Sequence, residues 1–137
     1  ERNYFYKDFF DCIKIINPDF FIFENVSGLM SSKPNGFSIF QDILIKAKKN
    51  GYNIINDKKT VLLNSAEFGV PQIRKRVFII GIKKKLNIKI NKIYSDINKL
   101  KTNIFSEDYL TVKDAIIDLQ PSPCVDCNYK VLQLTPR

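Results

Sequence analysis

An acidic and an amide side chain follow an apolar run near the start of the chain. The run is residues 20–23, and Glu24 and Asn25 come directly after it in the segment PDFFIFENVSGL, residues 18–29. A short apolar run of this kind is typical of a buried strand, and ligand sites in open α/β sheets form at the carboxyl ends of strands. Partial burial favours the neutral form of a carboxyl group, which makes Glu24 a candidate proton or hydrogen-bond donor. For this stretch alone, a solvated residue at a strand exit is the alternative.

A second set of polar side chains lies in the segment NSAEFGVPQIRKR, residues 64–76. Gln72, Arg74 and Arg76 occupy alternate positions, and alternate side chains of an extended segment point the same way. Two parallel guanidinium groups suit phosphate oxygens or the carbonyl oxygen of a base. Taken alone, these residues fit a surface basic patch equally well.

The composition excludes several kinds of site. The 137 residues contain no histidine, which excludes Ser-His-Asp and Cys-His catalysis within the chain and removes the commonest metal ligand. The three cysteines are an odd number, which argues against a disulfide framework and for a reducing compartment. Cys124 and Cys127 form a single C-x-x-C pair without further ligands, so we predict no metal site. Cys12 lies in a helical apolar pattern and is predicted to fill core space.

The charge points to a polyanionic partner. The formal net charge is +8 and the isoelectric point is near 9.4, which favours nucleic acid or another anionic surface. The chain is 45% hydrophobic and 26% charged, as in ordinary globular proteins. No apolar run approaches the roughly 20 residues that span a bilayer, so we expect no membrane association.

The periodicity of apolar residues predicts alternating helices and strands. Helical spacing predicts a helix over residues 4–16, with an apolar stripe formed by Phe5, Phe9, Ile13 and Ile16. It predicts a second helix from 35 to 51, with an apolar stripe formed by Phe37, Phe40, Ile43, Leu44 and Ala47. Strands are predicted at 19–24 and 77–82, with extended pieces within 52–63. The unbroken apolar character of 19–24 predicts a strand covered on both faces of a parallel sheet. This order of elements indicates an α/β fold, half of a doubly wound sheet.

The second half of the chain is less regular. Residues 83–106 are mixed Lys, Asn and Ile, which favours a linker or a peripheral excursion. The segment LTVKDAIIDL predicts a further helix, with Thr111 and Asp114 as its capping box and Ile116 and Leu119 facing inward.

The order of these motifs resembles the cytosine-C5 DNA methyltransferase family. In that family an ENV motif follows a buried strand, and a G-x-P-Q-x-R-x-R segment follows further along, as in LLNSAEFGVPQIRKRVFIIG here. The opening ERNYFY is similar to the motif that begins the preceding helix, and LTVKDAIIDLQPSP to the segment before the target-recognition region. The resemblance implies a partial Rossmann-like, class I methyltransferase sheet. Residues 1–83 would be the C-terminal half of the catalytic domain, and 84–137 a linker and the start of the target-recognition region.

The resemblance also implies roles for individual residues. Family members flip a cytosine out of double-stranded DNA, add a cysteine thiolate to C6 and transfer a methyl group from S-adenosylmethionine to C5. Glu24 matches the acid at the ring nitrogen N3, Arg76 the contact to O2, and Arg74 the arginine near phosphate and nucleophile. Asn25 matches a position that holds the loop and helps to place the backbone of the nucleophile, and Gln72 one that supports the loop around the flipped nucleotide. Phe5 falls where the family has a leucine that touches the cofactor.

Parts of the family pattern lie outside this sequence. The Pro-Cys-Gln nucleophile and the glycine-rich cofactor loop would precede residue 1, and Cys124, which follows the arginine motif, is not expected to replace that nucleophile. We therefore expect the isolated chain to be inactive, to bind the cofactor weakly at best, and to need a longer parent or a complementary methyltransferase chain. The alternatives are a non-catalytic nucleic-acid-binding remnant and a tRNA-directed relative. A prokaryotic, cytoplasmic location is expected.

Overall fold

The computed structural model describes residues 5–101 and 109–117. Its helices and strands, in chain order, are α1 (Phe5–Ile16), β1 (Phe20–Val26), α2 (Ile39–Lys49), β2 (Tyr52–Asn53), α3 (Lys58–Val61), β3 (Leu62–Asn64), β4 (Lys75–Lys83), α4 (Ile90–Lys99) and α5 (Val112–Ile116). Single 3-10 turns connect them, among them η2 (Ser27–Met30), η3 (Pro34–Gly36) and η4 (Ser65–Phe68). The predicted alternation of helices and strands is confirmed.

The sheet is built around β4. β1 pairs with one edge of β4 along residues 76–82, while β2 and β3 pair with opposite ends of its other edge. All of these pairs are antiparallel. β1 and β2 therefore run in the same direction, as in a β-α-β unit, with β4 inserted between them in the opposite direction.

The prediction that residues 19–24 form a strand covered on both faces of a parallel sheet is wrong for the described residues. β1 pairs with β4 in the antiparallel direction. The side chains of β1 alternate between exposed and buried along its first five residues. Phe21 and Phe23 are buried, whereas Phe20 and Ile22 are 66% and 57% exposed. β1 also extends to Val26, so the polar residues of the ENV motif lie within the strand rather than beyond its exit.

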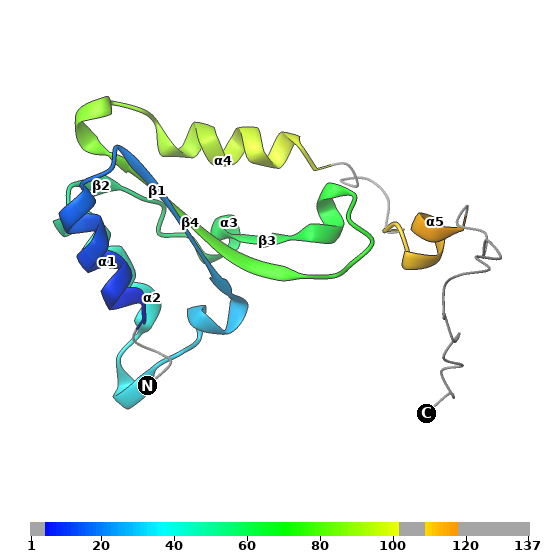
Figure 1. Cartoon of the computed structure of the whole chain (residues 1–137), viewed down its shortest axis with the longest axis horizontal. Coiled ribbons are helices and arrows are strands. Elements are labelled where there is room, and N and C mark those ends of the chain that lie inside the picture. The colour runs from blue at the N-terminus through cyan, green and yellow to red at the C-terminus, as the bar shows by residue number, and fades with distance from the viewer. Residues whose placement is uncertain (1–4, 102–108, 118–137) are drawn as a thin grey trace, which may run out of the picture.

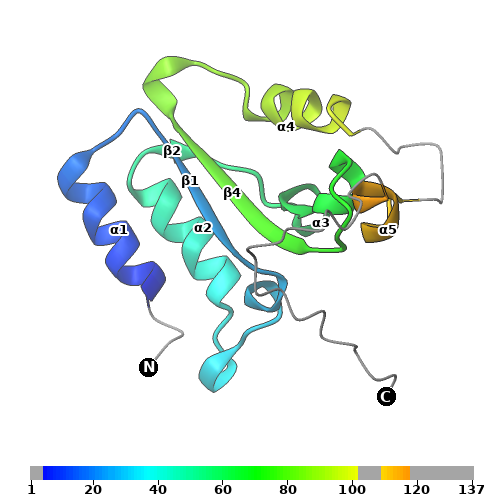
Figure 2. The same ribbon diagram turned by 45° about the vertical axis from the view of Figure 1, so that its right-hand side comes forward.

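Helices lie on both sides of this sheet. α1 and α2 lie on one side, and α4 lies on the other (Figures 1 and 2). The layer between α1, α2 and the sheet contains a cluster of aromatic rings in edge-to-face contact, formed by Phe9, Phe10, Phe21, Phe23 and Tyr52. This packing holds β1, which carries the ENV motif, and β2 against α1.

Gly81 allows this cluster to sit close to the sheet. It lies directly opposite Phe21 in the β1–β4 register. A Cβ atom added to Gly81 would collide with the ring of Phe21. The glycine is thus required for space and not for an unusual backbone angle.

The buried face of α1 differs from the predicted stripe. Tyr6, Phe10 and Ile13 are its buried residues, while Phe5 and Ile16 are exposed. The apolar residues continue around the helix, so their spacing alone selected a neighbouring face. Cys12 is exposed on α1, so the prediction that it fills core space is wrong.

α2 begins later than predicted and ends where predicted. Asn35 and Gly36 belong to η3 and have positive φ angles of 53° and 80°, which the α-helix does not tolerate. Ser38 caps α2 instead, and its side chain accepts from the Gln41 N–H at 3.4 Å. At the other end Gly51, with φ of 83°, terminates the helix.

Two helices occupy the irregular second half of the chain. α4 lies within residues 83–106, where the sequence analysis predicted no element. α5 has the predicted capping box between Thr111 and Asp114. Ile116 is 50% exposed, so its predicted inward orientation is wrong, and Leu119 lies outside the described residues. Cys124 and Cys127 also lie outside them.

Candidate active site

Glu24 and Arg76 form an ion pair across the two central strands. The Nε atom of Arg76 lies 3.0 Å from the Oε1 atom of Glu24. Arg76 is directly opposite Val26, and Glu24 is directly opposite Phe78, so the ion pair is diagonal across the sheet. Residues at these positions share one face of the sheet. The β1–β4 register therefore brings the two motifs together.

Arg74 lies on the same side as this pair. A cavity of about 350 Å³ is lined by Glu24, Arg74 and Arg76 together with six further residues: Leu63, Ser65, Phe68, Val70, Phe78 and Ile97. We call this cavity the Glu24 pocket. Three charged side chains thus stand in a pocket whose other walls are mainly apolar, which is the usual composition of a site for a small planar ligand.

A network of hydrogen bonds holds the segment that carries Arg74. The Oδ1 atom of buried Asn64 accepts from the N–H groups of Arg74 at 3.1 Å and of Ala66 at 3.5 Å. The N–H of Ser65 donates to the Arg74 carbonyl at 3.0 Å, and its hydroxyl donates to the Gln72 carbonyl at 2.5 Å. Asn64 is therefore a structural residue of the site.

The charged side chains of the Glu24 pocket already make some contacts within the protein. The Glu24 side chain is 48% exposed and the Arg76 side chain 23% exposed. Arg76 Nη1 donates to the Lys75 carbonyl at 3.0 Å, which fixes the plane of the guanidinium group. The Oε2 atom of Glu24 has no hydrogen-bond partner among the described residues. The pair thus offers one carboxyl oxygen and the remaining guanidinium N–H groups to a ligand.

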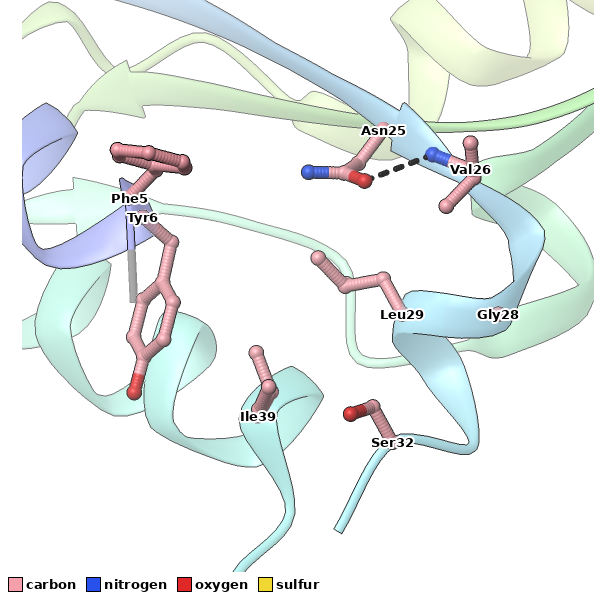
Figure 3. Close-up of a pocket in the computed structure, with 8 residues that line it drawn as sticks. All are labelled: Phe5, Tyr6, Asn25, Val26, Gly28, Leu29, Ser32 and Ile39. Carbon is pink, nitrogen blue, oxygen red and sulfur yellow. Dashed lines mark hydrogen bonds between the residues drawn. The ribbon is translucent and has the colours of Figure 1, made fainter. Parts of the chain in front are cut away.

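Asn25 faces the opposite side of the sheet from Glu24. Together with Phe5 it lines a second cavity, of about 370 Å³, between β1, η2 and the starts of α1 and α2 (Figure 3). We call this cavity the Asn25 pocket. The Oδ1 atom of Asn25 accepts from the N–H of Val26 at 2.8 Å, which leaves its amide nitrogen directed into the pocket (Figure 3). Phe5 is 68% exposed at this pocket.

The predicted site residues therefore fall into three places. Glu24, Arg74 and Arg76 come together in one pocket, whereas Asn25 and Phe5 share another. Gln72 is exposed, lies outside the residues that line either pocket, and contributes its carbonyl oxygen to the loop network.

The apolar walls of the Glu24 pocket were not predicted from the sequence. Phe78 alternates with Arg74 and Arg76, so the same period of two that aligned the arginines could have placed it on their face. Ile97 comes from α4, and only the tertiary structure brings it to this pocket.

The described residues contain no group of three or more His, Cys, Asp or Glu side chains arranged to hold a metal ion. No helix within residues 5–101 and 109–117 has both the length and the apolar character needed to cross a membrane.

Comparison with known proteins identifies the family. The family model described as C-5 cytosine-specific DNA methylase matches residues 1–134. The chain belongs to this family. Type II methyltransferase M.BspRI of Lysinibacillus sphaericus is 34% identical over 123 residues, which cover 90% of this chain and 27% of the relative. Type II methyltransferase M.NgoPII of Neisseria gonorrhoeae is 38% identical over 115 residues, which cover 82% of this chain and 30% of the relative.

A solved structure agrees with this assignment. An E. coli protein whose structure carries the name of a DNA modification methyltransferase encoded within a prophage superimposes with a TM-score of 0.61 at 30% identity. The match covers 84% of this chain and 29% of that chain. The α/β fold is therefore part of a DNA methyltransferase fold, as the sequence resemblance implied. The C5-methylase chain described here spans less than a third of the length of each of these proteins.

Proposed function

We propose that this chain is the part of a cytosine-C5 DNA methyltransferase, from a restriction-modification system, that binds and activates the flipped cytosine. The observation that carries the proposal is the shared position of Glu24, Arg74 and Arg76 in one apolar-walled pocket. The complete enzyme would transfer a methyl group from S-adenosylmethionine to C5 of the base.

The geometry suits a cytosine ring. Glu24 would place Oε2 beside N3 of the base, where a proton shared between the carboxyl group and N3 would relieve the charge that builds in the ring when a thiolate adds to C6. Arg76, whose orientation is fixed by Glu24 and the Lys75 carbonyl, would direct remaining N–H groups to O2. Arg74 would contact the phosphate next to the flipped nucleotide. A base bound between the apolar walls would displace water from the pocket and so strengthen these interactions.

The Asn25 pocket would serve the parts of the enzyme that carry the nucleophile and the cofactor. The amide nitrogen of Asn25 points into this pocket, where it would hold the loop that bears the catalytic cysteine. Phe5 offers one exposed aromatic face there, which fits an apolar contact to S-adenosylmethionine. The cofactor supplies the methyl group when bound. A single aromatic contact gives little affinity, so we expect weak cofactor binding by this chain alone.

The open edge of the sheet fits the same proposal. β1 is the last strand on its side of β4, and no other strand of the described residues pairs with its far edge. Further strands of a methyltransferase sheet, from a longer parent chain or a complementary chain, would pair there. We keep residues 1–83 as the catalytic half and 84–137 as the linker and start of the target-recognition region.

A methyl-transfer assay tests this proposal. The 137-residue chain, incubated with labelled S-adenosylmethionine and cytosine-rich DNA, should incorporate no label above buffer. Addition of a family polypeptide that carries the Pro-Cys-Gln motif and the glycine-rich loop should produce incorporation. Glu24→Gln should lower that rate by about 100-fold or more because it removes the proton donor.

Lys48 is exposed on α2, so Lys48→Ala is the control and should leave the rate unchanged. Incorporation by the chain alone would contradict the division of labour proposed here. Equal rates for Glu24→Gln and Lys48→Ala would contradict the role of Glu24.

A non-catalytic nucleic-acid-binding remnant is the second candidate, favoured by the net charge of +8. Such a protein would bind phosphates without regard to base, with an affinity that falls steeply with salt. Selectivity for an accessible cytosine separates the two functions.

A further inference from the structure

We propose that α4 is a positioning element of the Glu24 pocket. Tyr94 fixes the helix to the sheet and Lys101 fixes its C-terminal end to η4, so that Ile97 closes the pocket. This inference deepens the proposed function and rests on it. It concerns a segment in which the sequence analysis predicted no element.

Tyr94 anchors the helix to an otherwise unpaired stretch of β4. β2 pairs with residues 82–83 of β4 and β3 with residues 75–77, which leaves the same edge of 78–81 without a strand partner among the described residues. The Tyr94 hydroxyl donates to the Phe78 carbonyl at 2.8 Å and accepts from the Ile80 N–H at 3.0 Å. Tyr94 is only 2% exposed. Its side chain therefore replaces two ladder hydrogen bonds and sets the height of α4 above β4.

Lys101 ties the end of α4 to another wall of the pocket. Its Nζ atom lies 2.6 Å from the Oε2 atom of Glu67 in η4. The two side chains are 24% and 30% exposed, whereas those of the Lys99–Asp96 pair on α4 are 72% and 50% exposed. An ion pair shielded to this degree is screened less by water and salt than an exposed one.

These two contacts place the pocket wall. Ile97 follows Tyr94 by three residues and therefore lies on the same face of the helix. It lines the Glu24 pocket together with Phe78, whose carbonyl accepts from Tyr94, and with Ser65 and Phe68, the first and last residues of the 3-10 turn that contains Glu67. Displacement of α4 would open the pocket beside the arginines and increase the access of water to the partly exposed Glu24–Arg76 ion pair.

The test compares Lys99, the last residue of α4, with Lys101, two residues beyond it. Lys101→Met removes the shielded pair, and Lys99→Met, the matched control, removes the exposed one. The first readout is the hydrogen-exchange rate of the Arg76 Nε–H, followed by NMR. The second is the ratio of affinities for a DNA duplex with one mismatched cytosine and for the matched duplex. We expect Lys101→Met to raise the exchange rate and lower the affinity ratio by about threefold or more.

Variants that keep an ion pair between positions 67 and 101 should not show these effects. Lys101→Arg, and the exchanged pair Glu67→Lys with Lys101→Glu, should behave like the unmodified chain. Glu67→Gln should reproduce Lys101→Met and provides a second test if that variant does not fold. Exchange rates in Lys101→Met and Glu67→Gln equal to those in Lys99→Met would overturn the inference.

The two readouts separate this inference from the proposed function. If the unmodified chain shows no preference for the mismatched duplex, the proposed function fails. The Arg76 exchange rate then still decides whether α4 positions the pocket: faster exchange in Lys101→Met supports the inference, and an unchanged rate overturns it.

Discussion

Arg76 occupies a position in which three requirements meet. It belongs to β4, it pairs with Glu24 on β1 at 3.0 Å, and it lines an apolar-walled pocket. A lysine in its place could keep the charge but would lose the planar fork that contacts two acceptors at once. The identity of this residue therefore matters beyond its charge.

Much of the candidate site follows from the residues themselves. The period of two along a strand places Arg74 and Arg76 together, and it places Glu24 and Asn25 on opposite faces. The first consequence was predicted from the sequence, and the second was not. The distance between Glu24 and Arg76 depends on the β1–β4 register, which no local pattern contains.

Gly81 provides a residue-scale prediction about stability. Gly81→Ala should lower the free energy of unfolding by about 1–3 kcal/mol, because the added methyl group collides with a Phe21 ring held by its aromatic neighbours. Gly28→Ala is the control, since no atom lies within 4 Å of its added Cβ. Denaturant unfolding of both variants measures the difference, and equal midpoints would show that Phe21 can move aside.

At the scale of elements, the helices and strands with clear periodicity were predictable and their pairing was not. α1, α2, β1 and β4 lie close to their predicted positions. The antiparallel insertion of β4 depends on contacts between segments far apart in the sequence, and a run of apolar residues does not reveal it.

α4 shows how a signal can be present and overlooked. Its inward residues Ile90, Ile93, Tyr94 and Ile97 fit the i, i+3, i+4, i+7 pattern of an amphipathic helix. The surrounding Lys and Asn residues gave the segment the composition of a linker. Its role against β4 could not be predicted because it depends on the gap between β2 and β3.

Tyr94 provides an element-scale prediction about pH. Burial raises the pKa of Tyr94 above its ordinary value of 10.0, although the hydrogen bond from the Ile80 N–H opposes this. A raised pKa means that the unfolded chain releases this proton at lower pH than the folded one. The stabilising contribution is therefore complete below pH 10 and is lost as the pH rises above it.

Tyr94→Phe isolates this contribution. The variant should lose about 1–3 kcal/mol of unfolding free energy at neutral pH, because the Phe78 carbonyl and the Ile80 N–H lose their partner. Above pH 10 its stability should fall less steeply than that of the unmodified chain. The pKa of Tyr52 is also raised by burial, but Tyr52 is present in both proteins, so its contribution to the pH dependence of stability is the same in both. Parallel slopes in denaturant unfolding at pH 8 to 11 would contradict the anchoring role.

At the scale of the whole molecule, two sources of DNA affinity are superimposed. The net charge of +8 attracts any polyanion, and this attraction falls with salt. The Glu24 pocket, of about 350 Å³, offers three charged side chains between apolar walls, so it should respond to a single accessible base. Family membership accounts for both properties, and only the second requires the proposed chemistry.

The preference for an accessible cytosine tests the central claim most directly. At fixed salt, the unmodified chain should bind a duplex with one mismatched cytosine more tightly than the matched duplex, because a mismatched base leaves the stack more easily. Arg76→Ala should reduce this preference by about tenfold, the effect of losing a charged hydrogen bond. Lys48→Ala should keep the preference, because Lys48 lies outside the residues that line the Glu24 pocket. The absence of a preference in the unmodified chain, or its survival in Arg76→Ala, would contradict the claim that the Glu24 pocket receives the flipped base.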